Sequence, residues 1–423
     1  MQPIDRILAE IDHAADEIVQ FTVDLVRIPT VNPPGDEYEA CARFLGDHFT
    51  RTGLIVEFIV AEGRPEHSRR YPRVNVVGTR RGSGNGPVVH LNGHIDVVPP
   101  GDGWTLDPFG GVVRDGKIFG RGVCDMKAGI AAAVFAAEAI QRAGVVLPGT
   151  IEISGTVDEE SGGFAGVAWL AECGRIAKAR TDYVIIPEPL NVDRICVGHR
   201  GVYWSVLTTR GRIAHGSMPF LGVSAIDGMT EVLAAIRREL EPELARRVTS
   251  MPVVPEDARH GTINVNGIDG GQAVDGIQTP CVADRCRAVF DRRFLIEEGF
   301  TLAKDEIEAL VKRTLAAMPG VEYDLRDLMV VDPVQTPAGS PLVSALDTAI
   351  RRVLGTSPSL VASPGTYDHK HVARIAGVQH CVAYGPGELE LAHQPDEYCR
   401  ISDLVSATKV IALATLDLMG GGG

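Results

Sequence analysis

The sequence predicts an α/β protein, in which a three-layer domain with a mixed, mostly parallel sheet is interrupted by a smaller α+β domain. Short β-rich runs alternate with helical stretches over residues 1–198, and the same alternation of strands and helices returns over residues 316–423. Such alternation is typical of parallel strands covered by helices on both faces. The order of the elements changes over residues 199–315, which indicates a separate inserted domain.

The first segment begins with a helix, because Ile4, Leu8, Ile11 and Ala15 recur at spacings of three and four residues. Proline, asparagine and glycine at residues 29–35 end it. The further elements expected in this segment are helices at Tyr38–Arg51, Met126–Ala143 and Phe164–Ala171, and strands at Leu54–Val60, Asn75–Thr79, Val88–Leu91, Ile151–Val157 and Tyr183–Ile186.

The inserted domain is expected to contain three strands and two helices. In chain order they are Val202–Thr209, the helix Ala225–Leu240, Thr262–Ile268, Val282–Phe294 and the helix Thr301–Met318. This order predicts an α+β unit of ferredoxin-like type. The chain then returns to the first domain with a helix at Leu342–Leu354, an apolar strand at Val378–Ala383 and a closing helix at Ser402–Leu418.

Composition excludes several classes of function. With 41 Lys and Arg against 55 Asp and Glu, the net charge is -14, which repels a phosphate backbone, so no nucleic-acid partner is expected. No uninterrupted apolar run is long enough to span a membrane, and charged residues occur within the first turns, so neither a membrane span nor a secretory leader is expected. These patterns predict a cytoplasmic protein.

The eight cysteines lie far apart and form no CxxC pair. This spacing predicts reduced, mostly buried thiols and not a disulfide framework or a thiolate zinc site.

The segment LNGHIDVVPP places His94 and Asp96 two residues apart at the end of an apolar strand. Side chains two apart on a strand share a face, so Asp96 can approach the ring of His94. One imidazole nitrogen can then bind a metal ion while the other donates to a carboxylate. The alternative is a structural His-Asp pair at a strand end.

Further acidic and imidazole groups follow at loops and strand ends. Asp125 in GRGVCDMKAG either binds a ligand or caps the helix that follows. GTVDEESGG carries adjacent carboxylates that repel each other unless cations neutralise them. Glu188 lies between two prolines in IIPEP, and His393 lies in ELAHQPDE. Together these residues favour a site at the strand ends of one sheet, with nitrogen and oxygen ligands suited to zinc, cobalt or manganese.

The motifs HLNGHIDVVPPGDGWTLDPF, GRGVCDMKAG, TVDEESGG and IIPEP, in this order, resemble the di-metal family of aminoacylases, acetylornithine deacetylases, succinyl-diaminopimelate desuccinylases and carboxypeptidase G. The resemblance spans almost the whole chain. It implies two divalent ions, zinc ahead of cobalt or manganese, with Asp125 bridging them. The other ligands it implies are His94 and Glu188 for one ion, and Glu160 and His393 for the second.

The resemblance also assigns roles next to the ligands. Asp96 becomes the partner of His94, and Glu159 the general base beside the metals. Two divalent cations, three carboxylates and a bridging hydroxide carry no net charge together, so such a cluster can occupy a partly buried cleft. The mechanism expected is attack of a metal-bridging hydroxide on an amide carbonyl, with Glu159 passing the proton of the water to the leaving nitrogen.

Five residues outside the metal motifs are expected to contact the substrate. By resemblance, His215 in RIAHGSMPF stabilises the oxyanion, reaching in from a partner subunit in a homodimer, although an ordinary loop histidine is the alternative. Asn264 occupies the family's substrate-contacting position. Arg293, in preference to Arg292, grips a substrate carboxylate, with surface exposure as the alternative for both. Gly365 and Thr366 complete this set.

The predicted function is therefore removal of an acyl group from an N-acyl amino acid or a related small amide that carries a carboxylate. A second hypothesis is hydrolysis of another C–N bond, in an aryl amine, a carbamoyl group or a dipeptide, with the same site. A third is a non-catalytic ligand-binding relative, but all six metal and base positions are filled. Tyr367 replaces a small residue of the family pattern, and either contacts the substrate or packs outside the pocket.

Overall fold

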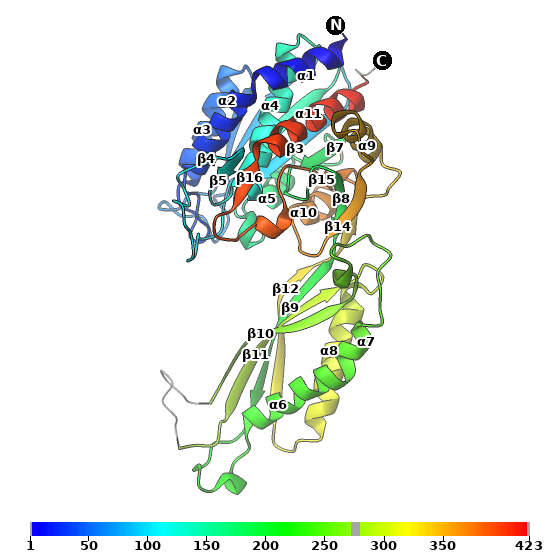
Figure 1. Cartoon of the computed structure of the whole chain (residues 1–423). Coiled ribbons are helices and arrows are strands. Elements are labelled where there is room, and N and C mark those ends of the chain that lie inside the picture. Colours follow the sequence, from blue (N-terminus) through cyan, green and yellow to red (C-terminus); the bar gives the residue numbers. More distant parts are fainter. Residues whose placement is uncertain (1, 272–279, 421–423) are drawn as a thin grey trace. The chain divides into compact units, whose positions relative to one another are not determined.

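The computed structural model describes residues 2–271 and 280–420, and these residues divide into two units (Figure 1). The first unit contains the chain up to Gly198, Thr336–Val361 and the chain from Tyr367 onward. The second unit contains His199–Gln335 and Ala362–Thr366. The first unit is therefore assembled from separate segments of the sequence.

A mixed sheet forms the middle of the first unit. Its strands are β1 (Ile55–Val60), β2 (Val74–Arg80), β3 (Val88–His94), β6 (Thr150–Thr156), β7 (Tyr183–Ile186), β8 (Arg194–His199), β14 (Ser359–Ser363) and β15 (Cys381–Ala383). They lie in the order β1-β2-β6-β3-β7-β15-β8, and β14 pairs with β8. The central pairs β6/β3, β3/β7 and β7/β15 are parallel, and the pairs β1/β2, β2/β6 and β15/β8 are antiparallel. The mixed sheet predicted from the sequence is confirmed, with its parallel part at the centre.

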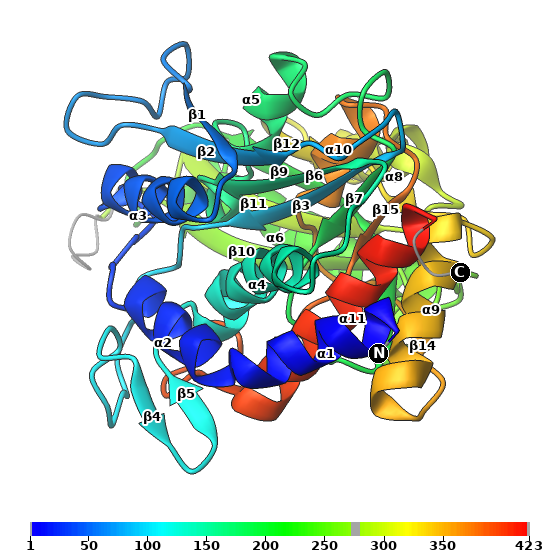
Figure 2. The same cartoon turned by 90° about the horizontal axis from the view of Figure 1, so that it is seen from above.

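Helices cover both faces of this sheet. They are α1 (Pro3–His13), α2 (Ala15–Val26), α3 (Tyr38–Arg51), α4 (Ala128–Arg142), α5 (Val167–Glu172), α9 (Pro341–Leu354), α10 (His369–Arg374) and α11 (Ile401–Leu418). Figure 2 shows α1, α4 and α11 on one face, and α5 and α10 on the other. The three-layer arrangement is as predicted.

The alternation of side chains along β3 decides where the polar residues of the strand point. A Cβ on Gly93 would lie 2.6 Å from Ile130 of α4, so this position faces the α4 layer. Successive residues of a strand point to opposite faces, so His90, Asn92 and His94 face the layer of α5 and α10. The carboxyl end of β3 therefore delivers His94 on that side of the sheet.

Several elements differ from the sequence-based expectation. The predicted N-terminal helix is two helices that meet at Ala14, and the predicted helix from Met126 begins as α4 at Ala128, after a turn at Val123–Lys127. A small sheet of β4 (Val112–Arg114), β5 (Lys117–Phe119) and β16 (Tyr398–Arg400) was not foreseen. Three-residue strands leave too short an alternation to be recognised in a sequence.

The second unit consists of β9 (Gly201–Arg210), α6 (Ala225–Ala235), α7 (Glu241–Leu244), β10 (Thr262–Gly270), β11 (Arg285–Phe294), α8 (Gly299–Ala316), β12 (Glu322–Val331) and β13 (Val334–Gln335). Four of its strands form an antiparallel sheet in the order β10-β11-β9-β12. With α6 and α8 as its long helices, the unit has the βαββαβ order of the ferredoxin-like type. Its core includes Leu207, Met229, Phe290 and Ile307, which are fully buried.

The second unit ends later than the sequence predicted. The expected return to the first domain at residue 316 is wrong, because β12 follows that point and pairs with β9 along its whole length, from Glu322↔Arg210 to Val331↔Val202. Its residues are mostly exposed and gave a weak apolar signal, since this edge strand buries only Val331 fully.

Within the described residues, none of the helices has both the length and the apolar character needed to cross a membrane.

Candidate metal centre and active site

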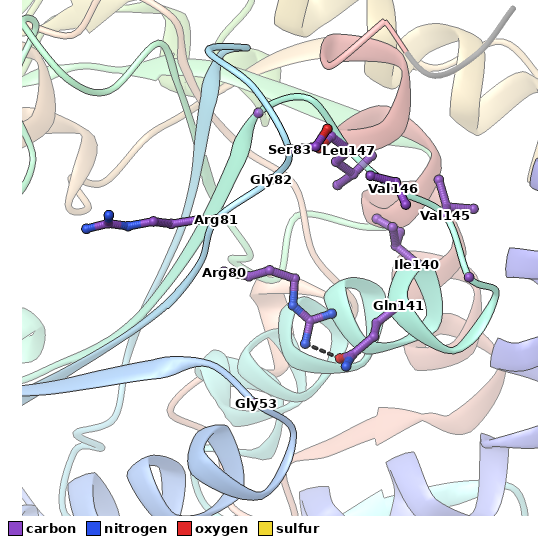
Figure 3. Close-up of a pocket in the computed structure, with 12 residues that line it drawn as sticks. Gly53, Arg80, Arg81, Gly82, Ser83, Ile140, Gln141, Val145, Val146 and Leu147 are labelled. Carbon is purple, nitrogen blue, oxygen red and sulfur yellow. Dashed lines mark hydrogen bonds between the residues drawn. The ribbon is translucent and has the colours of Figure 1, made fainter.

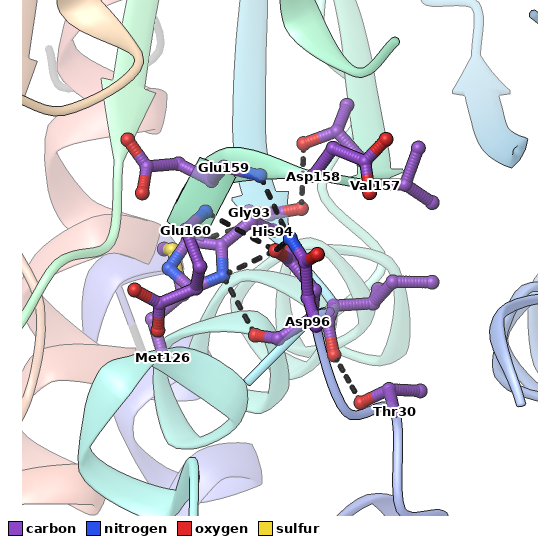
Figure 4. A network of polar contacts seen from close by, with 12 residues as sticks. Thr30, Gly93, His94, Asp96, Met126, Val157, Asp158, Glu159 and Glu160 are labelled. Atoms are coloured by element: carbon purple, nitrogen blue, oxygen red, sulfur yellow. Dashed lines mark hydrogen bonds and ion pairs between the residues drawn. The ribbon is translucent and has the colours of Figure 1, made fainter. Parts of the chain in front are cut away.

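His94 at the end of β3 is fixed through one ring nitrogen and presents the other. Its ring is buried, with Nδ1 3.0 Å from the main-chain carbonyl of Asp96 and 3.5 Å from the Asp96 carboxylate (Figure 4). Donation from Nδ1 leaves Nε2 facing Asp125, whose Oδ1 lies 3.0 Å away. This is the orientation that a histidine ligand of a metal ion adopts.

The carboxylate of Asp96 also organises the acidic turn that follows β6. Its Oδ1 accepts from the backbone N–H of Glu159 and its Oδ2 from that of Glu160, both at 3.1 Å. The side-chain amide of Asn32 donates to Oδ2 at 2.8 Å. Burial by itself raises the pKa of Asp96, but the hydrogen bonds from His94, Asn32 and Glu160 outweigh it and hold the pKa below its usual value. Asp96 is therefore an ionised anchor for both His94 and the turn.

Asp125 does not act as a helix cap, the alternative left open by the sequence. The residue before α4 is Lys127, and no side chain caps this helix. Glu397 Oε1 instead accepts from the backbone N–H groups of Cys124 and Asp125, at 2.8 and 3.2 Å. Arg121 binds the other oxygen of Glu397 at 2.6 Å. This buried pair holds the turn so that the Asp125 side chain points to the histidines.

The three consecutive acids Asp158, Glu159 and Glu160 separate into one structural residue and two site residues. Asp158 adopts a left-handed backbone conformation and accepts from Tyr38 Oη at 2.9 Å and from Arg73 Nε at 2.8 Å. Glu160 lies 3.1 Å from His393 Nε2. The Glu159 side chain points in another direction than that of Glu160, as Figure 4 shows. The repulsion expected among adjacent carboxylates is therefore relieved by sending them in different directions.

The five residues predicted as ligands converge. Asp125 presents Oδ1 to His94 and Oδ2 to His393, whose Nε2 is 3.5 Å away, and Glu188 Oε1 lies 3.8 Å from His94 Nε2. The donor atoms of His94, Asp125 and Glu160 all lie within 4.8 Å of one another. Two ligands of one tetrahedral zinc ion are roughly 3.3 Å apart, since each bond is about 2.0–2.1 Å long. The observed separations are close to that value, so the donor set fits metal ions.

The pKa directions in this group reflect burial and the closeness of its carboxylates and histidines. Burial and the Asp125 carboxylate raise the pKa of Glu188 well above its usual value, and burial raises that of Glu160 to about 7. Hydrogen bonds to Asp125 and Glu160 raise the pKa of His393 to about 10. Burial lowers the pKa of His94, but Asp125 and Asp96 outweigh it and raise the pKa. Divalent cations bound among these donors would stabilise the ionised carboxylates.

A lysine that the sequence did not single out lies beside Glu159. Lys370 Nζ is 3.0 Å from Glu159 Oε1, and both side chains are almost completely buried. Burial lowers the pKa of Lys370, but the Glu159 and Asp368 carboxylates outweigh it and raise the pKa. Single lysines are mostly solvated, so no sequence signal distinguished this one.

Tyr367 packs inside the first unit. It is 5% exposed, and its hydroxyl lies 3.5 Å from Cys196 Sγ and 3.3 Å from His369 Nδ1. The structure thus places the Tyr367 side chain in a buried polar cluster. All eight cysteines are free, in line with the predicted reduced thiols.

The remaining predicted site residues belong to the second unit. His215 is exposed, and its Nδ1 accepts from the backbone N–H of Ser217 at 3.1 Å. Asn264 donates to Asn266 at 2.6 Å in β10. The backbone N–H of Gly365 donates to Ser363 at 3.1 Å, and Thr366 is half-buried.

The two arginines of β11 face opposite ways, as expected for neighbours on a strand. Arg292 is fully buried and donates to Glu298 at 2.7 Å, so it is a structural residue. Arg293 is half-buried and pairs with Asp291 at 2.7 Å. Of the pair, Arg293 is the less buried residue.

A separate hollow of about 340 Å³ lies in the first unit, between the end of β2 and the loop after α4 (Figure 3). Arg80 donates there to Gln141 and to the main-chain oxygen of Thr52. Its guanidinium therefore links β2 to α4 and to the end of α3. The hollow shares no residue with the group around His94.

Residues 90–417 match the model of the peptidase family M20/M25/M40. The chain is 30% identical to a succinyl-diaminopimelate desuccinylase of Methylobacterium nodulans, over 92% of this chain and 93% of the relative. It is 29% identical to a desuccinylase of the same name from Psychrobacter arcticus, over 96% of both chains.

Solved structures share the fold at lower identity. An aminopeptidase PepT from Bacillus cereus superposes with a TM-score of 0.75 at 23% identity, covering 96% of this chain and 99% of that one. The YXEP protein of Bacillus subtilis, described as a dinuclear metal binding peptidase, gives 0.69 at 15% identity, covering 96% and 99%.

Proposed function

This chain belongs to the peptidase family M20/M25/M40, whose members hydrolyse amide bonds, and we propose that it is a di-metal deacylase of N-acyl amino acids. The curated relatives support a deacylase over a peptidase, because those named above are desuccinylases that align along nearly the whole chain. The two peptidase structures compared above are at most 23% identical to this chain, so they support the shared fold and not a shared activity.

The observation that supports the metal centre is the division of the Asp125 carboxylate, with one oxygen toward His94 and the other toward His393. A carboxylate placed in this way suits a bridge between two cations. We assign His94 and Glu188 with Asp125 to one ion, and Glu160 and His393 with Asp125 to the other. Nitrogen and oxygen donors without thiolate favour zinc, with cobalt or manganese as alternatives.

Two divalent ions held there would acidify a water molecule and polarise the amide carbonyl. The residues of the chain supply the other requirements. Asp96 fixes the His94 ring and the backbone of the acidic turn, so that the donors keep their positions. Glu159 accepts the proton of the water and donates it to the leaving nitrogen, a transfer that needs one carboxylate within reach of both.

In the second unit we assign substrate contacts by resemblance and local geometry. Because a backbone N–H can only donate, the contact from Ser217 leaves Nδ1 of His215 without a proton, and the neutral ring carries its proton on Nε2. Such a nitrogen suits donation to an oxyanion. Arg293 suits a substrate carboxylate, and Asn264, Gly365 and Thr366 suit polar contacts to the rest of the substrate. We also propose that the protein forms a homodimer and is located in the cytoplasm.

A second candidate function is hydrolysis of another C–N bond, in a dipeptide, a carbamoyl group or an aryl amine. The fold is compatible with this candidate, because it is shared by the aminopeptidase above and by human carnosine dipeptidase 1 (TM-score 0.73, 20% identity, 99% and 100% covered). The same base and the same donors serve each of these reactions.

The test is a substrate panel with enzyme loaded separately with zinc, cobalt or manganese. It contains N-acetyl and N-succinyl amino acids, dipeptides, N-carbamoyl amino acids and aryl amides, with release of amine as the readout. We expect turnover of N-acyl amino acids that carry a free carboxylate. Turnover confined to dipeptides or carbamoyl compounds would replace the deacylase assignment with the second candidate.

A further inference from the structure

The strongest contact to Glu159 that the proposed chemistry does not use comes from Lys370. Its ammonium lies 3.0 Å from Glu159 Oε1, and the exposed fractions of the two side chains are 5% and 11%. Ion pairs at the surface are common and weak, but an ammonium group rarely leaves water without a specific partner. The burial of Lys370 therefore calls for a role at the place where it is held.

Lys370 faces acids from several elements of the first unit. Glu159 follows β6, Asp368 precedes α10 on the chain segment of Lys370 itself, and Glu188 follows β7, and all three carboxylates act on the lysine. Only the contact with Glu159 is a close ion pair. The lysine thus offsets a local excess of negative charge and directs its hydrogen bond to one carboxylate in particular.

The lysine is anchored to the strand that ends in His94. Asp368 Oδ2 accepts from Asn92 Nδ2 at 2.9 Å, and Asn92 Oδ1 accepts from Ser154 Oγ at 2.7 Å. Asn92 and Ser154 are register partners in β3 and β6. The start of α10 is therefore tied to the same strand pair that delivers His94 and leads into the acidic turn. This network fixes Lys370 relative to the metal-binding donors.

A base that takes a proton from water and gives it to an amine must keep one oxygen free and directed to the reacting atoms. We propose that Lys370 is a positioning residue, which holds Oε1 of Glu159 so that Oε2 stays directed toward the water and the leaving nitrogen. This proposal rests on the assignment of Glu159 as general base. It adds a role for a residue that acts through Glu159 and does not touch the substrate.

The test is a double-mutant cycle in the metal-loaded full-length enzyme, with the best N-acyl amino acid of the panel as substrate. K370M removes the cation at similar length. We expect it to lower kcat about 10- to 100-fold, with KM within about twofold and unchanged metal content, because misdirection of a catalytic group acts on the reacting step. In an E159Q background, which has lost the base, the same substitution should change kcat less than about twofold.

Two further variants separate positioning from simple support of the fold. K370R keeps the cation, so we expect its kcat to exceed that of K370M at the same KM. K409M is the matched control, because Lys409 pairs with Asp12 at 2.5 Å in the same unit, outside the acidic centre. It should keep wild-type kcat and KM.

Three results would overturn the role of Lys370. They are an equal loss of kcat from K370M in the wild-type and E159Q backgrounds, a rise in KM without loss of kcat, and a K370R variant no better than K370M. If K370M does not fold, the comparison of K370R with K370Q decides in the same way. Failure of the proposed function looks different: E159Q retains wild-type turnover, or no amide in the panel is cleaved.

Discussion

Replacement of Asp96 by asparagine tests whether the metal centre depends on one buried carboxylate. In the native site its two oxygens accept from the backbone N–H groups of Glu159 and Glu160 and from Asn32. Asparagine offers one acceptor oxygen and an NH₂ group, so at least one buried donor loses its acceptor, at a cost of about 1–3 kcal/mol.

This cost falls on the turn that bears Glu160 and on the orientation of His94. Loss of a residue that orients a ligand lowers metal affinity about 10- to 100-fold, which corresponds to about 1.4–2.7 kcal/mol. The two magnitudes agree. We therefore expect D96N to bind zinc 10- to 100-fold more weakly and to lose activity in proportion, with partial recovery at high metal concentration.

The assay is competition for zinc against a chelator of known affinity, together with kcat measured across metal concentrations. D347N is the control, because Asp347 forms an exposed pair with Arg351 at 2.7 Å, and such pairs contribute little. Wild-type zinc affinity and activity in D96N would refute the reasoning. If D96N binds zinc with normal affinity but has a lower kcat at saturating zinc, Asp96 positions the base Glu159 and not the metal ligands.

Three further predictions concern the base, the metals and the titration of the site. E159A should retain metal but lose about 10²-fold or more in kcat, which metal analysis and steady-state kinetics will check. Removal of metal by a chelator should abolish activity and lower the melting temperature, since ions that bind only the folded state stabilise it; a metal-free enzyme with full activity would contradict this. In the metal-free protein the pKa of His393 is raised to about 10, so its stabilising contribution is complete below about 6.5 and is lost as the pH rises through about 10. Denaturation of the metal-free protein at several pH values should show this loss, and H393Q should reduce it.

The convergence of several predicted donors follows from how parallel sheets are built. His94 ends β3, and Asp158–Glu160 and Glu188 follow β6 and β7; these three neighbouring strands are parallel to one another. The carboxyl ends of parallel strands meet at one edge, where ligand sites of such sheets form. Recognising the strands therefore sufficed to bring these residues together. Asp125 and His393 lie outside these strands, and their assignment to particular ions came from the resemblance.

The boundary at residue 316 shows where sequence reasoning failed. Membership of β12 in the second unit is decided by its pairing with β9, more than a hundred residues earlier in the chain. Nothing local in Glu322–Val331 records that partner, and an edge strand with few buried side chains has a weak pattern. Strand geometry likewise predicted that Arg292 and Arg293 point to opposite faces, but it could not predict which of the two faces is buried.

The contacts that hold the ligand-bearing turns could not be predicted for a related reason. Asp96 holds the backbone of the Glu159–Glu160 turn, and Glu397 holds the backbone of the Cys124–Asp125 turn, each through a buried carboxylate that accepts two N–H groups. In both cases the anchor comes from a different segment than the turn it holds. The ligand-bearing turns are thus defined by long-range acceptors, which a local pattern does not contain. The contact of Lys370 with Glu159 is also long-range. The residues with chemistry and the partner of His94 could therefore be found in the sequence, while the contacts that orient the turns and Glu159 required the fold.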